Sequence, residues 1–254
     1  MSGQVEGDGN PVKAHRLFVG VRVSLATVQA LDEAVHEMRR TWSGERRVRW
    51  VSPASYHVTL KFLGWTRPEV AFALRDRLAT ATAGLRAFEL ETRRVGAFPG
   101  LERARVLWAG VDEVGAARLV ELAGRVERAA EELGFAREER AFHPHVTLAR
   151  LPSPIDVREL VSRCSEQMFR LSWVDSVVLF ESKMKSSGSE YEEKARWPLD
   201  GDSKPPRRHT GPVDTEGDLG DEMALDEPPG DDPGPEGAAD RGEEQEHRDD
   251  GDKY

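Results

Sequence analysis

The sequence predicts an α+β fold built from two similar lobes. Segments with the two-residue alternation of strands are followed by segments with helical periodicity, and a strand–helix–strand phrase recurs over residues 16–63 and 104–150. The last strand of each phrase carries the same tetrapeptide, His-Val-Thr-Leu, at 57–60 and again at 145–148. The repeat indicates that the two phrases occupy equivalent positions in the two lobes.

The first phrase is a strand, a helix and a second strand. Residues 15–23, HRLFVGVRV, are mostly apolar and β-branched, as is typical of a strand, and Ser24 is suited to cap the helix that follows. The strand at 56–63 stops at Gly64, and Pro68 suits the first turn of the next helix. Apolar residues at three- and four-residue steps define the inner faces of these helices: Leu25, Val28, Leu31, Val35 and Met38 in the first, and Val70, Leu74, Leu78 and Ala81 in the second.

The second half repeats this order of elements. A helix is expected from about 116 to 133, and Ser153 and Pro154 open a short helix further on. The strands expected in this half lie at 87–95, 104–111, 145–150, 171–182 and 191–199. Trp108 and Trp173 stand in apolar strand runs and are expected in the core.

Charge and composition divide the chain into three parts. Residues 201–254 hold 18 acidic and 6 basic side chains, whereas residues 1–200 hold 28 acidic and 30 basic ones and all six tryptophans. The acidic, Pro/Gly-rich segment 201–254 has little apolar surface to bury, so it is expected to be a disordered tail. Residues 1–13 are expected to be a short disordered lead, and residues 14–200 to be the folding unit.

Cysteine use and hydropathy predict a cytoplasmic protein. Cys164 is the only cysteine, which excludes an intrachain disulfide and favours a reducing compartment. No apolar run approaches the roughly 20 residues that cross a bilayer, and the N-terminus lacks the apolar region of a signal peptide. We therefore expect no contact with a membrane.

The paired tetrapeptides carry the chemistry of the sequence. His57 and Thr59 project from one face of a strand, and His145 and Thr147 repeat the arrangement. Two imidazoles and two hydroxyls brought together suit a phosphodiester. One neutral histidine takes a proton from water, one protonated histidine gives a proton to the departing sugar oxygen, and the threonines donate to anionic oxygens. This chemistry needs no metal or cofactor.

Other interpretations remain open at this point. A single strand histidine is more often a structural, hydrogen-bonded residue than a catalytic one, and His143, His145 and His57 could instead be three zinc ligands. The stretch RRTWSGERRVRW, 39–50, suits an RNA strand or a solvated loop equally well. A second basic cluster, at Arg93, Arg94, Arg103 and Arg105, is as consistent with a cleft-side loop as with ordinary surface charge.

Four motifs in order resemble a known family. They are RWVSPASYHVTLKFLG at 49–64, GAFP at 96–99 before ARVLWAGV, FHPHVTLAR at 142–150, and the closing Y…ARWPL at 191–199. The chain resembles the two-histidine phosphoesterases, specifically their RNA 2′,3′-cyclic phosphodiesterase branch, also called the 2′-5′ RNA ligase family. The resemblance implies a bilobal protein with two antiparallel sheets lining a central cleft and helices outside.

The resemblance also implies roles for particular residues. His57 is the expected proton donor, His145 the expected proton acceptor, and Thr59 and Thr147 the expected phosphate contacts. The implied reaction leaves a 2′-phosphate, with weak 2′-5′ ligation as its reverse, and the implied partners are RNA or nucleotides with 2′,3′-cyclic phosphate ends, bound by a monomer. A non-catalytic nucleotide- or RNA-binding module using the same cleft is the alternative.

Two further residues stand five positions after the histidines. The resemblance implies that Arg150 contacts substrate phosphate and that Phe62 faces a base. Strict strand alternation, however, places both side chains on the face opposite the histidines.

Overall fold

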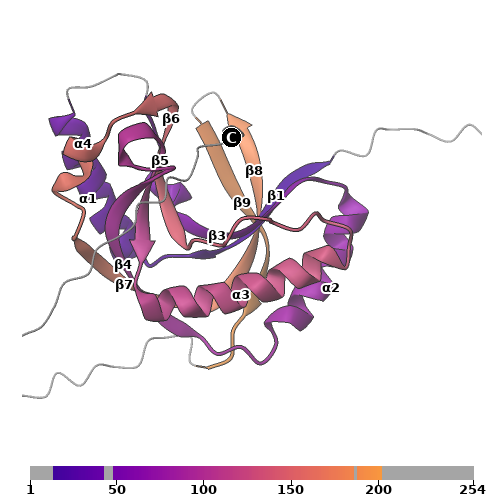
Figure 1. Ribbon diagram of the computed structural model, residues 1–254. Helices are drawn as coiled ribbons and strands as arrows, with labels where there is room; N and C mark the ends of the chain where they lie inside the picture. The colour runs from indigo at the N-terminus through magenta and orange to yellow at the C-terminus, as the bar shows by residue number, and fades with distance from the viewer. Residues whose placement is uncertain (1–13, 43–47, 186–187, 202–254) are drawn as a thin grey trace, which may run out of the picture. The chain divides into compact units, whose positions relative to one another are not determined.

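The computed structural model describes residues 14–42, 48–185 and 188–201, which belong to one compact unit (Figure 1). The predicted lead at 1–13 and the predicted tail at 201–254 lie outside the described residues, except for Gly201, and stay predictions. The elements are β1 (His15–Arg22), α1 (Leu25–Thr41), β2 (Arg49–Trp50), η1 (Pro53–Ser55), β3 (His57–Thr66), α2 (Pro68–Thr82), β4 (Phe88–Phe98), η2 (Leu101–Arg103), β5 (Ala104–Val111), α3 (Glu113–Glu131), β6 (His145–Ile155), α4 (Arg158–Ser162), β7 (Met168–Val174), β8 (Ser176–Lys185) and β9 (Gly188–Pro198).

The nine strands that the structure describes belong to one antiparallel sheet. Its order is β7-β4-β5-β6-β3-β1-β8-β9, with the short β2 pairing with β6. The order contains two halves of four strands each, and the halves meet where β3 pairs with β6. The predicted α+β class with two similar antiparallel halves is thus confirmed, and the two halves are joined edge to edge into one curled sheet (Figure 1).

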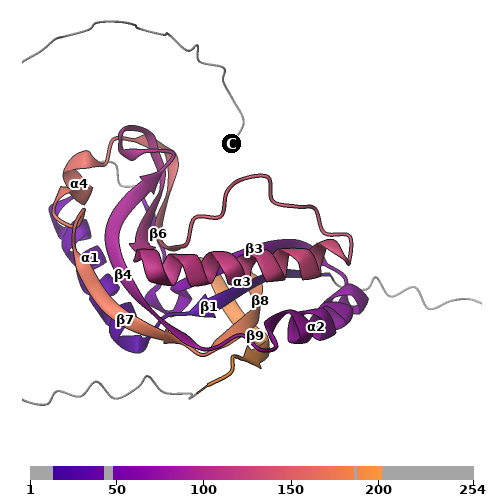
Figure 2. The ribbon, with the colours of Figure 1, turned by 60° about the horizontal axis from the view of Figure 1, so that its bottom comes forward.

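The helices cover one face of this sheet. In Figure 2, α3 runs across both halves against β3 and β4, and α2 packs beside it, while α1 and α4 flank the half that contains β4 and β7. The main core lies beneath the helices and includes Val58, Leu60, Val146 and Leu148 from the two repeated tetrapeptides. The opposite face carries a small separate cluster of Phe18, Val178 and Phe180.

Local sequence signals account for the helix starts. The Ser24 hydroxyl accepts from the Thr27 N–H at 3.1 Å and caps α1, as predicted. Pro68 occupies the first turn of α2, and the Asp112 carboxylate caps α3 by accepting from the Gly115 N–H. Leu25 differs from the prediction: it lies in the first turn of α1 and is 72% exposed, whereas Thr27 is buried there.

Helix α1 crosses between the halves. It follows β1 in the chain but packs against β7 and α4. Polar contacts fix it there, because the Ser24 N–H donates to the Ser172 hydroxyl at 2.9 Å and the Thr27 and Ser172 hydroxyls are 2.8 Å apart.

The strand after the second tetrapeptide is longer than predicted. It runs to Ile155, where it pairs with Ala104, and includes Ser153 and Pro154. The expected short helix begins only at Arg158. Pairing with β5 therefore overrides the helix-start signal of Ser153 and Pro154.

A buried ion pair ties β3 to α3. The Lys61 ammonium lies 2.6 Å from the Glu127 carboxylate, with the two side chains 5% and 19% exposed. Lys61 also donates to the Ala136 carbonyl at 2.9 Å, and the Glu138 N–H donates to Glu127 at 3.0 Å. The pair thereby also fixes the segment between α3 and β6.

No helix in the described part of the chain is long and apolar enough to span a membrane.

Glu127→Gln should lower the free energy of unfolding by about 3 kcal/mol, because it leaves the Lys61 charge buried without its partner. Glu121→Gln is the control, since Glu121 pairs with the partly exposed Arg118 and Arg125 and should cost less than about 1 kcal/mol. Urea titration at neutral pH measures both. Equal losses in the two variants would contradict the structural importance of the buried pair.

Candidate active site

The junction of the two halves brings the four predicted polar side chains onto one face. Val58 pairs with Val146, and both side chains are fully buried on the helical side. The residues on either side of this pair therefore point to the opposite face. By antiparallel register from this pair, His57 lies across from Thr147 and Thr59 lies across from His145, so residues from both halves share this face.

Both histidines are anchored in the same way. His57 Nδ1 lies 2.7 Å from the Ser55 carbonyl oxygen, and His145 Nδ1 lies 2.7 Å from the His143 carbonyl oxygen. A carbonyl oxygen only accepts, so each Nδ1 carries a hydrogen and each neutral ring keeps a lone pair on Nε2. The anchors leave Nε2 of both rings as the atom that can take a proton.

The His57 ring is enclosed by aromatic side chains. It stacks on Phe18 with 4.7 Å between ring centroids, and the Tyr191 ring meets it edge-on at 5.0 Å. Its Nε2 accepts from the Thr59 hydroxyl at 2.9 Å. The pKa of His57 is lowered to about 4, chiefly by burial. The hydrogen bond to Ser55 opposes this shift, and the nearby charges of His145, Arg22 and Arg150 add to it.

The His145 ring has different neighbours. Phe98 meets it edge-on at 5.2 Å, and Trp108 and His143 lie at 6.4 and 6.2 Å. Burial lowers the pKa of His145, with smaller contributions in the same direction from the charges of His143 and Arg150. The two imidazoles therefore share their anchors but differ in their surroundings.

Trp108 belongs to this face and not to the core, contrary to the sequence prediction. It is the cross-strand partner of Thr147, it is only half-buried, and its ring lies 4.9 Å from that of His143. Gly96 makes room for it, since a Cβ there would come within 2.4 Å of the indole. A glycine across from a large aromatic residue is a sequence signal of such packing. The sequence did not show, however, that the strand with Gly96 pairs with the strand with Trp108.

Matching β-bulges bring Phe62 and Arg150 to the histidine face. On β3, Gly20 pairs with Thr59 but Val19 pairs with Lys61, so Leu60 is an extra residue. On β6, Leu148 is the extra residue in the same way, because Trp108 pairs with Thr147 and Leu107 with Ala149. The expectation that Phe62 and Arg150 face away from the histidines is therefore wrong. Each bulge shifts the alternation by one residue, so the third and the sixth residue of each strand point to the same face.

The positions of the two side chains agree with this reversal. The Phe62 ring lies 5.9 Å from that of Phe18, which stacks on His57. Arg150 is exposed, and its charge acts on both histidines. Its neighbour on β2 is the exposed Arg49, the part of the basic 39–50 stretch that borders this face, whereas residues 43–47 lie outside the described part.

The three-histidine zinc interpretation gains no support from the geometry. Among the residues that the structure describes, no three His, Cys, Asp or Glu side chains are grouped so that they could hold a metal ion. The His143 ring instead packs on Trp108.

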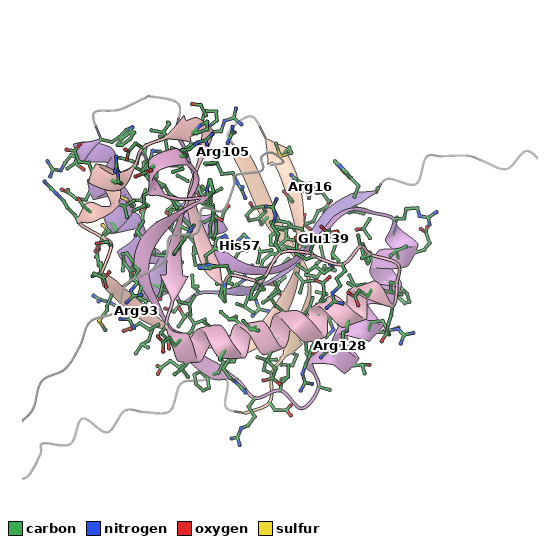
Figure 3. The ribbon with its side chains drawn as sticks, in the orientation of Figure 1. Arg16, His57, Arg93, Arg105, Arg128 and Glu139 are labelled. Atoms are coloured by element: carbon green, nitrogen blue, oxygen red, sulfur yellow. The ribbon has the colours of Figure 1, made fainter. Side chains whose placement is uncertain are left out.

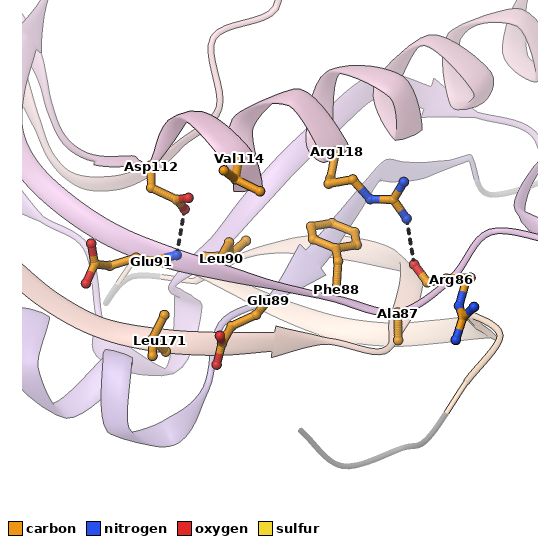
Figure 4. A pocket seen from close by; sticks show the side chains of 10 residues that line it. All are labelled: Arg86, Ala87, Phe88, Glu89, Leu90, Glu91, Asp112, Val114, Arg118 and Leu171. Atoms are coloured by element: carbon orange, nitrogen blue, oxygen red, sulfur yellow. Dashed lines mark hydrogen bonds between the residues drawn. The ribbon is translucent and has the colours of Figure 1, made fainter. Parts of the chain in front are cut away.

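A surface hollow of about 470 Å³ lies elsewhere, between β4 and the start of α3 (Figure 4). Arg118 lies over the Phe88 ring at 5.5 Å and donates to the Arg86 carbonyl, while Asp112 accepts from the Glu91 N–H at 2.7 Å. These polar groups satisfy one another, and none of the paired histidines or threonines lines the hollow.

A family model described as the 2′-5′ RNA ligase superfamily matches residues 27–183. The chain belongs to this family. Relatives named RNA 2′,3′-cyclic phosphodiesterase include one from Aeropyrum pernix, 38% identical over 119 residues that are 47% of this chain and 66% of that protein. Another, from Archaeoglobus fulgidus, is 32% identical over 180 residues, or 70% of this chain and 97% of the relative.

Solved structures share the fold of this chain. A protein from Thermus thermophilus is 26% identical with a TM-score of 0.60, and the match covers 72% of this chain and 97% of that one. Escherichia coli LigT in its apo form is 23% identical with a TM-score of 0.58, covering 74% and 98%, and shares the fold.

The depressed pKa of His57 predicts a loss of stability in acid. Between its ordinary pKa of 6.5 and its folded pKa of about 4, the unfolded chain binds a proton that the folded chain does not, so the unfolding free energy falls as the pH falls through this window. We expect His57→Gln to reduce the drop between about pH 7 and pH 4.5 by about 1–3 kcal/mol. Urea titrations at both pH values measure it.

His36→Gln is the matched control for replacing a histidine with glutamine, because His36 is exposed on α1 and is not enclosed by aromatic side chains. If His57→Gln lost as much stability on acidification as the wild-type protein, the enclosure of the ring would not be what lowers its pKa.

Proposed function

We propose that this protein hydrolyses the 2′,3′-cyclic phosphate ends of RNA to 2′-phosphomonoesters by metal-independent acid–base catalysis. The observation that carries the proposal is the β3–β6 junction, which sets two imidazoles and two threonine hydroxyls on one face. The names of the relatives, RNA 2′,3′-cyclic phosphodiesterase, supply the substrate class. The paired groups suit that substrate, because a cyclic phosphodiester needs a proton removed from water and another delivered to a sugar oxygen.

In the proposed reaction, the water oxygen attacks phosphorus and the bond from phosphorus to O3′ breaks. His145 Nε2 takes the proton from the water, and His57, protonated on Nε2, gives its proton to O3′. Thr59 and Thr147 donate to the non-bridging oxygens. The products are a 2′-phosphate and a 3′-hydroxyl, and exchange of protons with solvent returns both histidines to their starting states.

Substrate binding favours the protonated form of the histidine that acts as the acid, and the proton comes from solvent. Burial disfavours the charged form of both rings in the free protein. An anionic phosphate beside them raises their pKa values, because an opposite charge favours the protonated form. The Thr59 hydroxyl, which donates to His57 in the free protein, is then available to donate to the phosphate.

Arg150 and Phe62 have supporting roles in the proposal. Arg150 is placed to balance the charge of the phosphate, and Phe62, which is 62% exposed, offers a face on which the terminal base can stack. If the 5′-hydroxyl of another RNA end took the place of water as the nucleophile, its oxygen would bond to phosphorus as O3′ leaves, giving a 2′-5′ phosphodiester, which is the weak 2′-5′ ligation. We further propose that the protein acts as a cytoplasmic monomer, in keeping with its one buried, unpaired cysteine.

Replacing either histidine should lower turnover of a small 2′,3′-cyclic nucleotide. His57→Ala and His145→Ala should each lose about 10²–10⁴-fold in kcat, and the double variant should lose far less than the product of the two, because the groups act together. His36→Ala should turn over normally. A folded single variant with a near wild-type rate would contradict the acid–base roles of the histidines, whereas a wild-type protein that binds the cyclic nucleotide without turning it over would favour the alternative, a binding module without catalysis.

Removal of metal should leave turnover intact. After exhaustive EDTA treatment we expect an unchanged kcat, and His143→Ala should remain within a few-fold of the wild-type rate. If EDTA abolished the activity, zinc restored it, and His143→Ala were inactive, the three-histidine metal site would replace the acid–base mechanism.

A further inference from the structure

A row of side chains extends away from the histidines along the same face of the sheet. Strand β1 alternates strictly, with Leu17, Val19 and Val21 in the core, so its even-numbered residues face the histidine side. Across from β1, His57 pairs with Arg22 and Thr59 pairs with Gly20. Next in the row, Phe62 pairs with Phe18 and Trp65 pairs with Arg16. The two bulges of β3 therefore place Trp65 one step beyond Phe62 in this row.

Trp65 is an unusual surface residue. Its side chain is 73% exposed, and Phe62 beside it is 62% exposed. Neighbouring large apolar side chains left open to water on a sheet are typical of a binding surface. In the described part of the chain, these are the two exposed aromatic side chains that share a sheet face with His57.

An arginine accompanies the exposed tryptophan. Arg16 is the cross-strand partner of Trp65, and it precedes Arg22, the partner of His57, on β1. Figure 3 labels Arg16 and His57 at separate places on the sheet. Among the described residues Arg16 forms no ion pair, and its guanidinium lies 3.9 Å from the Met184 sulfur. Arg22, at the histidine end of the same row, is paired with Glu193 at 3.2 Å. The free positive charge thus lies beside Trp65.

We propose that Trp65 and Arg16 form a second-nucleotide subsite, in which the base 5′ to the cyclic end of an RNA stacks on Trp65 and the adjoining phosphodiester binds Arg16. This inference rests on the proposed function, which places the cyclic phosphate at the histidines and the terminal base on Phe62. It adds that the substrate is an oligonucleotide whose single strand follows β3.

The spacing of the row suits successive nucleotides. Each step corresponds to two residues of β1, or about 7 Å. A step of this size is comparable to the repeat of one nucleotide in an extended single strand. Exposed aromatic side chains interleaved with unpaired basic ones are the usual means by which proteins hold single-stranded nucleic acid without regard to sequence.

The charge of this surface favours RNA over a protein partner. The row begins at His57, where the proposed function places the phosphate, and ends at Arg16, which has no ion pair among the described residues. Arg150 on β6 and Arg49 on β2 are also exposed. A polyanion with flat bases complements both properties, whereas a second copy of this chain would bring two positive surfaces together.

The test compares a 2′,3′-cyclic mononucleotide with a trinucleotide that has the same cyclic end. We expect Trp65→Ala to lower kcat/KM for the trinucleotide by about 5- to 150-fold, the worth of one stacked base, and to leave the mononucleotide unchanged. Trp65→Phe should restore most of the loss. Phe72→Ala is the matched control, since Phe72 is a 69% exposed aromatic on α2, away from this face.

Arg16→Gln tests the phosphate contact separately. It should weaken binding of a 3′-phosphorylated trinucleotide and reduce the slope of log K against log salt by about 0.7. The exposed Arg75→Gln on α2 is its control and should leave the slope unchanged. Fluorescence anisotropy of the labelled trinucleotide gives these values and does not depend on turnover.

Each outcome decides one proposal. If the wild-type protein binds the trinucleotide through Trp65 but turns over neither substrate, the subsite holds and the proposed function fails. If Trp65→Ala and Arg16→Gln change neither trinucleotide kcat/KM nor its affinity, the subsite is overturned. It is also overturned if sedimentation shows a dimer that Trp65→Ala dissociates while the RNA measurements are unmoved, because Trp65 would then be a contact between copies.

Discussion

The pairing of Val58 with Val146 is the constraint on which the rest of the site depends. It joins two four-stranded halves into one sheet, and the burial of both valines fixes which face the adjacent histidines and threonines occupy. A slip of one residue in this register would turn His57 and Thr59 into the core while leaving His145 and Thr147 outside. The hydrophobic core under the helices therefore sets the geometry of the polar face opposite.

The two halves provide equivalent anchors but unequal environments. Each Nδ1 is fixed by a carbonyl at the same distance, whereas one ring is stacked on Phe18 and the other meets Phe98 edge-on. A pair of identical sites would have equal proton affinities and no reason to divide acid from base. The different packing of the rings is the physical source of an asymmetry that suits the two roles we propose.

Much of this arrangement was predictable, and the remainder depended on contacts distant in sequence. Alternation around the tetrapeptides gave the faces of His57 and His145, and Ser24 and Pro68 marked helix starts correctly, because these signals act within a few residues. The bulges at Leu60 and Leu148 are visible only as mismatches with β1 and β5. The prediction for Trp108 failed for the same reason, because its position depends on a contact distant in sequence. Its ring packs over Gly96, and the sequence did not show that these two strands pair.

The order in which the strands occur in the chain has a consequence for synthesis. The half of the sheet that begins with β1 and β3 is completed by β8 and β9, and Phe180 and Tyr191 from these last strands pack around His57. A nascent chain that ends before β8 therefore possesses both histidines but lacks much of the wall around the first. The contacts that close this wall join residues more than 120 positions apart, so they form late and slowly. A ribosome-bound fragment would thus hold no finished catalyst until nearly the whole folding unit had emerged.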